Sequence, residues 1–357
     1  MRSETTKNPV AVPTAPKWWL WVVDRIATVP ASAWALILIL LVMPLVASEF
    51  FLFQIFGWSF ILGIIALSLM FLAGYGGMVS LIQMSVAGLA GYMVALFGSS
   101  GAEISLGLPW WFVVPLAICI ATLFGTIVGL LAVRTEGIYT IMITLAMASA
   151  FFYFTRQNYT IFNGYTGFNL VLPPDLFGVD WRRPVPFYYL TLFFAAACYL
   201  LVTYVSRAPF GLALQGVRDN VRRMSALGYN VTAHRVAAYA FASVLASIGG
   251  ILLVWQNAQI VPGTAGIGAV FDILIIAVLG GLSRPSGPFL GAFLFVLLAT
   301  YAPEFLRAIG ASGERYKTLI GAVFLLVVYF SPDGMLGLWE RWKARISRDR
   351  LDATRGE

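Results

Sequence analysis

Long apolar stretches without a charged residue follow one another along most of the chain. A helix that crosses a bilayer needs about 20 predominantly apolar residues, and the uncharged stretches provide ten such segments. The stretch 50–102 is 53 residues long, too long for one helix, so we expect it to turn at the glycines of 74–77. The ten predicted spans cover about residues 26–48, 50–74, 77–102, 110–133, 137–155, 184–206, 236–255, 268–282, 287–301 and 318–331.

The composition points to the same class of protein. Of the 357 residues, 60% are hydrophobic and 11% are charged, whereas an average soluble domain has roughly 25% charged residues. So few charges cannot cover the surface of a water-soluble globule of this size. The composition therefore excludes a soluble enzyme, a nucleic-acid-binding module and a disordered chain. It predicts an all-α fold, a polytopic bundle of membrane helices.

The positions of the basic residues predict the topology. Loops on the cytoplasmic side of a membrane carry an excess of Lys and Arg. With ten spans and the N-terminus inside, the cytoplasmic segments hold 17 of the 23 Lys and Arg residues and the outer segments hold six. We therefore expect both termini in the cytoplasm. The predicted organisation is an interfacial segment at 1–25, a transmembrane domain at 26–338 and a basic cytoplasmic tail at 339–357.

The longest predicted inner loop, 206–234, has an amphipathic pattern. Leu214, Val217, Val221 and Met224 fall within an arc of about 80° on a helix, and charged residues occupy the other face. Pro209 is suited to begin this helix and Gly228 to end it. By itself the pattern fits a helix lying on the membrane surface or one that docks into a groove of a soluble partner.

The outer loop 156–186 is long and rich in aromatic residues, which argues against disorder. Its glycine-containing stretch includes Asn163, Gly164 and Gly167. The pattern fits a lid, a docking surface or a structural connection.

Residues suited to chemistry are scarce. One histidine, His234, is too few for a multi-histidine metal site, and the two cysteines lie in apolar stretches, so we expect neither a metal nor a disulfide framework. Asp272 is the one strong ionisable candidate inside a span, as part of an ion path or as an N-terminal helix cap. The sequence has no phosphate-binding loop and no nucleophile–base pair. We therefore expect no catalytic residue and no bound cofactor.

Five motifs follow one another along most of 59–338. They are Gly74-Tyr75-Gly76-Gly77-Met78-Val79-Ser80-Leu81, Arg134-Thr135-Glu136-Gly137-Ile138-Tyr139 with Thr144-Leu145-Ala146, the loop from Arg207 to Val231, Val278-Leu279-Gly280-Gly281-Leu282 with Gly287-Pro288 and Gly291-Ala292, and Ser331-Pro332-Asp333-Gly334-Met335-Leu336-Gly337. This ordered set resembles the permease subunits of bacterial branched-chain amino acid ABC importers, the LivM-type family. Two departures are Ile82, where the family often has glycine, and Leu212, where a basic residue is common.

The resemblance implies partners and roles. The partners would be two cytoplasmic ABC ATPase subunits that hydrolyse ATP, a second related permease subunit, a periplasmic substrate-binding protein and the lipid bilayer of the bacterial inner membrane, without nucleic acid. The expected ATPase-coupling residues are Pro209, Phe210, Gly211, Leu214, Val217, Arg218, Asp219 and Val221. The expected pore or substrate path contains Gly74, Tyr75, Gly77, Ser80, Gln83 and Asp272, and the expected outer-loop site contains Asn163, Gly164 and Gly167.

Other functions remain open from the sequence. Within the ABC class, urea or short-chain amides are alternative substrates. An ion-coupled secondary transporter would need ion-binding residues at mid-membrane, for which Asp272 is the available candidate. An intramembrane enzyme would need a paired nucleophile and base, which the spans do not contain.

Overall fold

The computed structural model describes residues 31–101, 104–174, 178, 180–308, 310, 316–331, 334, 335 and 337. The predicted interfacial segment at 1–25 and the tail at 339–357 lie outside these residues. The chain divides into two units, residues 1–48 and 49–357. The first unit contributes helix α2, Ala31–Val46, which lies within the first predicted span.

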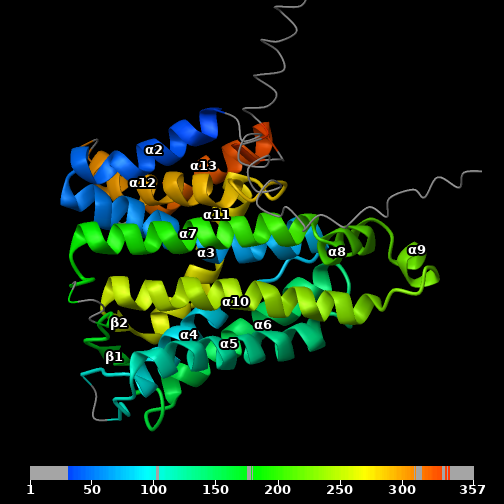
Figure 1. Cartoon of the computed structure of the whole chain (residues 1–357), viewed down its shortest axis with the longest axis horizontal. Helices are drawn as coiled ribbons and strands as arrows, with labels where there is room; N and C mark the ends of the chain where they lie inside the picture. Colours follow the sequence, from blue (N-terminus) through cyan, green and yellow to red (C-terminus); the bar gives the residue numbers. More distant parts are fainter. Residues whose placement is uncertain are drawn as a thin grey trace, which may run out of the picture. The chain divides into compact units, whose positions relative to one another are not determined.

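The second unit is almost entirely helical. Figure 1 shows long helices side by side, with two short helices, α8 and α9, at one end and a two-stranded sheet at the other. We call these the α8–α9 end and the β1–β2 end. The elements are η1 (Phe51–Gly57), α3 (Trp58–Met70), η2 (Phe71–Tyr75), α4 (Gln83–Phe97), α5 (Trp110–Ala132), α6 (Ile138–Gln157), β1 (Phe168–Asn169), α7 (Pro184–Arg207), α8 (Pro209–Asp219), α9 (Val221–Ala226), α10 (Val231–Asn257), β2 (Gln259–Ile260), η3 (Pro262–Ala265), α11 (Ile267–Gly280), α12 (Gly287–Ala308) and α13 (Tyr316–Phe330).

Each predicted span overlaps an apolar helix or a continuous run of helices, but the third, 77–102, begins with non-helical residues, and its helix α4 covers only Gln83–Phe97. Among the described residues, six helical runs are long and apolar enough to cross a membrane: 51–75, α5, α6, α7, α10 and α12. Helices α4, α11 and α13 are apolar but shorter. The helical, multi-span architecture is therefore confirmed, and the number of ten spans and the cytoplasmic termini stay predictions.

Burial separates a central layer from an outer one. We compare the share of buried residues in the most apolar part of each long helical run. This share is 83% in the run 51–75 and 67% in α10, but only 28–33% in α5, α6, α7 and α12. The outer helices present large apolar side chains such as Leu123 and Phe193, which are 61% and 66% exposed. Lipid tails are as apolar as leucine, so this surface suits a bilayer.

Small residues bring the central helices close together. A Cβ on Gly250 of α10 would collide with the backbone of Ala87 on α4, and one on Gly129 of α5 would lie 2.6 Å from the ring of Tyr239 on α10. Backbones can approach this closely only where side chains are small. These glycines are therefore explained by helix packing.

Between η2 and α4 the chain re-enters the bundle without helical structure. We call residues 76–82 the re-entrant segment. Gln83, which follows it, accepts a 3.1 Å hydrogen bond from the Ser68 hydroxyl, and Ser68 lies six residues, about 9 Å of helix, before Gly74. Non-helical backbone at membrane depth needs partners inside the protein, and the Leu81 N–H donates to Thr144 Oγ1 on α6 at 3.1 Å. Two motifs far apart in the sequence thus meet here.

The inner loop differs from the single helix expected between Pro209 and Gly228. It forms two helices, α8 and α9, because Asn220 adopts an extended conformation between them. Its side chain accepts a 2.9 Å hydrogen bond from the Arg223 N–H and so caps α9. Asparagine competes for backbone hydrogen bonds in this way and favours caps over helix interiors.

Candidate functional site

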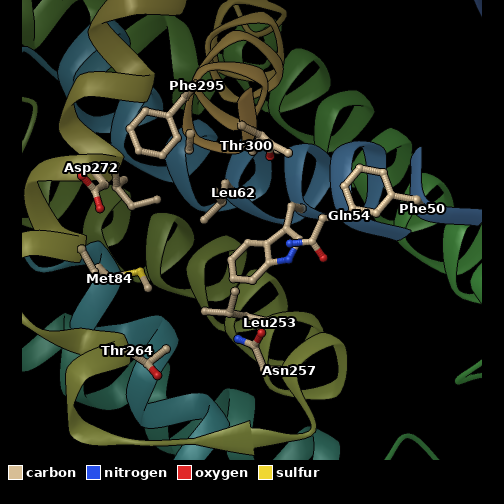
Figure 2. Close-up of a pocket in the computed structure, with 15 residues that line it drawn as sticks. Phe50, Gln54, Leu62, Met84, Leu253, Asn257, Thr264, Asp272, Phe295 and Thr300 are labelled. Carbon is tan, nitrogen blue, oxygen red and sulfur yellow. The ribbon is translucent and has the colours of Figure 1, made fainter. Parts of the chain in front are cut away.

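The β1–β2 end of the bundle contains a pocket of about 520 Å³. Its wall comes from seven elements, η1, α3, α4, α10, η3, α11 and α12, and is mostly apolar. Figure 2 shows polar side chains distributed around it, with Asp272 on one side and Gln54 and Asn257 on the other. The polar lining residues are Gln54, Asn257, Thr264, Asp272 and Thr300.

Asp272 lies in this pocket and is not a helix cap. Helix α11 begins at Ile267, with Gly266 as its N-cap, so Asp272 belongs to the second turn. The side chain is partly buried, and it is the one charged residue in the pocket wall. Within the described part of the chain it forms no hydrogen bond and no ion pair within 4.0 Å; Lys317 on α13 acts on it only through space. The capping alternative from the sequence is therefore wrong.

Close contacts between helices hold the pocket wall in place. A Cβ on Gly291 of α12 would collide with the Ile276 carbonyl of α11, so the two helices that carry the pocket residues Thr300 and Asp272 pack tightly against each other. Gln256 Nε2 donates a 2.6 Å hydrogen bond to the Phe53 carbonyl in the π-helix η1. The wide turn of a π-helix is typical of functional sites, and here it shapes the stretch that carries Gln54.

A second notable region is the contact between α8 and the end of the run 51–75. The Arg218 guanidinium donates a hydrogen bond to the Gly74 carbonyl and forms a 2.9 Å ion pair with Asp219. Gly77 has φ +67°, and a Cβ there would lie 2.6 Å from Arg218 Cγ. Arg218 therefore joins the inner loop to the π-helix η2.

The buried face of α8 packs inside the protein itself. Leu214 and Val217 are fully buried, and Gly211 lies so close to the backbone of Val205 and Ser206 that no Cβ would fit. The sequence predicts that Leu214 and Val217 fill a groove in another protein, but their surface packs against the chain's own helices. Helix α9 and the turn after it are exposed, with Leu227 at 67%, and on the other face of α8 Leu212 is 59% exposed.

Aromatic and ionic contacts anchor this turn to α10. The rings of Phe210 and His234 stack with centroids 5.9 Å apart, and Tyr229 meets the same imidazole edge to face at 5.6 Å. Arg235 lies 3.7 Å from Glu136 in the turn between α5 and α6. The histidine thus has a packing role at the α8–α9 end.

Comparison with known proteins identifies the family. A family model described as "Branched-chain amino acid transport system / permease component" matches residues 51–328. The chain belongs to this permease family. Its relatives are transport components, and with the six long apolar helical runs among its described residues the chain is a multi-pass membrane protein.

Individual relatives are distant. The LivM permease of Methanocaldococcus jannaschii is 26% identical over 62% of this chain and 67% of its own length. LivM of Salmonella typhimurium is 23% identical over 76% of this chain, and the match spans 65% of that protein. The ribose import permease RbsC of Haemophilus influenzae is 24% identical over 85% and 92% of the two chains. No solved structure matches the chain significantly.

Of the six residues expected in the substrate path of this permease, one lines the pocket: Asp272. Gln83 is buried and precedes the pocket residue Met84, and its amide nitrogen has no hydrogen-bond partner among the described residues. Gly74, Tyr75, Gly77 and Ser80 lie in η2 and the re-entrant segment, near α8. The pocket residues Gln54, Asn257, Thr264 and Thr300 were not anticipated, because isolated amides and hydroxyls near helix ends give no sequence signal.

The outer-loop residues build a compact connection. Asn163 Nδ2 donates a 2.7 Å hydrogen bond to the Gly167 carbonyl, and both residues have positive φ. A Cβ on Gly167 would collide with the Ile260 carbonyl of β2, the partner strand of β1. The loop is thereby tied to β2, which leads into η3 and the pocket wall, and this gives Asn163 and Gly167 a structural role.

Proposed function

We propose that the chain is the permease subunit of a binding-protein-dependent ABC importer that moves branched-chain or related amino acids across the bacterial inner membrane. Family membership supports the transport role. The proposed partners are two cytoplasmic ATPase subunits, a second related permease subunit and a periplasmic substrate-binding protein. This chain contributes no nucleotide-binding motif, so ATP would be hydrolysed by the ATPase subunits.

One observation carries this proposal: a single continuous helical run joins the two candidate regions. Residues 51–75 begin at the pocket, where Gln54 and Trp58 line the wall, and end at Gly74, which accepts the hydrogen bond from Arg218 of α8. A movement of the inner loop would reach the pocket through this run. Such a link is what an importer needs when ATP is hydrolysed outside the membrane and the substrate is released through it.

The proposed contact with the ATPase is helix α9 together with the turn after it, residues 221–230. It is exposed, combines an apolar side chain, Leu227, with the cations Arg222 and Arg223, and is held by α8. Buried apolar anchors with a polar rim are typical of protein interfaces. Of the expected coupling residues, Arg218 and Asp219 end α8 and Val221 begins α9. Leu214 and Val217 act by holding α8 in place.

The ribose permease among the relatives supports a second candidate substrate class, neutral polar molecules such as sugars or short amides. Uptake by proteoliposomes that contain the whole complex tests the proposal. With binding protein outside, ATP inside and no ion gradient, we expect accumulation of leucine, isoleucine or valine. Accumulation that depends on an ion gradient and not on ATP would favour a secondary transporter, and accumulation of ribose or urea alone would favour the second substrate class.

A further inference from the structure

The pocket at the β1–β2 end contains one charged side chain, Asp272. Among the described residues Asp272 has no ion-pair partner within 4.0 Å, and Lys317 of α13, which acts on it through space, is not part of the pocket wall. A carboxylate that is partly removed from water is stabilised by a cation placed against it. The pocket therefore has a defined place for a positive group on a ligand.

The rest of the pocket wall indicates which other chemical groups the ligand carries. Aliphatic and aromatic side chains cover most of it, and they suit a hydrocarbon side chain. Polar groups that can donate hydrogen bonds, the amides of Gln54 and Asn257, lie on the side away from Asp272 in Figure 2. The apolar lining residues include Leu62, Leu253, Ile273, Phe295 and Val296.

We propose that this pocket is a transit site for an aliphatic α-amino acid, in which Asp272 binds the ammonium group and selects against substrates without one. The amides of Gln54 and Asn257 face the carboxylate of the bound amino acid, and the apolar wall receives its side chain. The volume of about 520 Å³ lies within the range of small-molecule sites. This inference rests on the proposed importer function and names its substrate class from the site.

A metal ion fits the pocket less well. A site that holds a divalent metal ion by protein side chains usually gathers several carboxylate, thiolate or imidazole ligands, and the described residues include no group of three or more His, Cys, Asp and Glu side chains that could hold one. A ligand that carries both an ammonium group and a hydrocarbon chain uses the carboxylate and the apolar wall together.

Protection of an introduced thiol measures occupancy of the pocket directly. The variant Ala299→Cys, in a background with Cys119→Ser and Cys198→Ala, places a thiol in the pocket wall. The complete complex in nanodiscs is treated with a water-soluble thiosulfonate in the presence of three probes. L-leucine carries ammonium and carboxylate, leucinamide carries ammonium alone, and 4-methylpentanoate carries carboxylate alone.

We expect L-leucine and leucinamide to slow the modification and 4-methylpentanoate to leave it unchanged. Asp272→Asn should raise the concentration of leucine needed for protection by at least about tenfold, since a charge-assisted hydrogen bond is lost, and Asp272→Glu should retain protection. The matched control is Glu304→Gln, because Glu304 is an exposed carboxylate on α12 that does not line the pocket; it should behave as the parent does.

Several results would overturn the inference: equal protection by 4-methylpentanoate, undiminished protection in Asp272→Asn, protection by sodium alone, or a thiol that no water-soluble reagent reaches. Uptake separates this failure from failure of the proposed function. If the unaltered complex accumulates leucine with ATP but Asp272→Asn accumulates it equally well, the transit site is wrong and the importer stands. If the unaltered complex accumulates no amino acid although leucine protects the thiol, the importer proposal fails and the site stands.

Discussion

At the scale of single residues, the most informative contact is that between Arg218 and Gly74. The guanidinium reaches over Gly77, whose positive φ and missing side chain leave room for it. A neighbouring anion, Asp219, orients the same guanidinium at 2.9 Å. One long side chain thus joins the inner loop to the run 51–75.

Arg218→Ala should uncouple the two regions. The variant removes the hydrogen bond to Gly74 while the buried face of α8, Leu214 and Val217, still holds the helix in place. We expect the complex to assemble normally and ATP-driven uptake to fall severalfold. Asp219→Asn removes only the ion pair and leaves the bond from Arg218 to Gly74, so it should lower uptake less than Arg218→Ala does. Unchanged uptake by Arg218→Ala would show that the inner loop acts through other contacts.

Glycines in the bundle differ in how much space surrounds them, which allows a matched test. Gly250→Ala would place a Cβ against the Ala87 backbone, whereas the Cβ of Gly268→Ala would have no atom within 4 Å. Overpacking a close helix contact typically costs about 1–3 kcal/mol, while alanine is favoured over glycine inside a helix by up to about 1 kcal/mol. Thermal unfolding of the purified complex should show a lower midpoint for the first variant and an equal or higher one for the second.

At the scale of elements, α8 and α9 divide the work of the inner loop. Helix α8 packs on α7, α10 and η2, and α9 projects from it (Figure 1). The break at Asn220 is what allows the two helices to face different surroundings. An unbroken helix would keep its whole apolar arc on one side.

This division predicts opposite outcomes for two aspartate substitutions. Leu227→Asp changes an exposed side chain of the turn after α9, so the permease should fold and insert but lose the ATPase on purification. Val217→Asp buries an unpaired carboxylate among the protein's own helices and should lower the yield of folded permease itself. Leu172→Asp, at the β1–β2 end and 42% exposed, should affect neither.

The measurements are ATPase recovery in pull-down and permease yield by size-exclusion chromatography. If Val217→Asp gives a well-folded permease that has lost only the ATPase, then α8 and not α9 forms the interface, as the amphipathic pattern first suggested.

At the scale of the whole molecule, the main prediction concerns sidedness. In the described part of 49–357, seven arginines lie at the α8–α9 end of the bundle. They are Arg134, Arg207, Arg218, Arg222, Arg223, Arg235 and Arg284. The cytoplasmic assignment rests on these together with the basic residues near both chain ends.

Single cysteines at exposed loop positions test this topology. Ser225→Cys in α9 should react with a membrane-impermeant reagent only in inverted vesicles, and Tyr165→Cys in the loop before β1 only in intact cells. Both substitutions are at exposed positions, so folding should be retained. The reverse pattern would place the inner loop away from ATP and would remove the basis of the importer proposal.

Much of the architecture was predictable from the sequence, because each membrane helix is determined by its own stretch of residues. In a bilayer each helix must satisfy its own backbone hydrogen bonds, so a long uncharged stretch is by itself enough to indicate a helix, and the turn near 74–77 followed from its glycines. The amphipathic pattern of the inner loop also located α8 correctly. It could not reveal the break at Asn220, because a capping asparagine and a helical one look the same in sequence.

The sequence by itself determined the membrane class, the places of the apolar helices and, through its ordered motifs, the family. Only the tertiary structure decided which residues meet, Thr144 with Leu81 and Arg218 with Gly74, and which line one pocket, Asp272 together with Gln54 and Asn257. These pairs depend on the rotation and depth of helices that pack against each other. Packing of this kind follows from close backbone contacts at glycines and is not encoded in any one segment. For this reason Asp272, which in sequence fits a helix cap, lies in the second turn of α11 and faces the pocket.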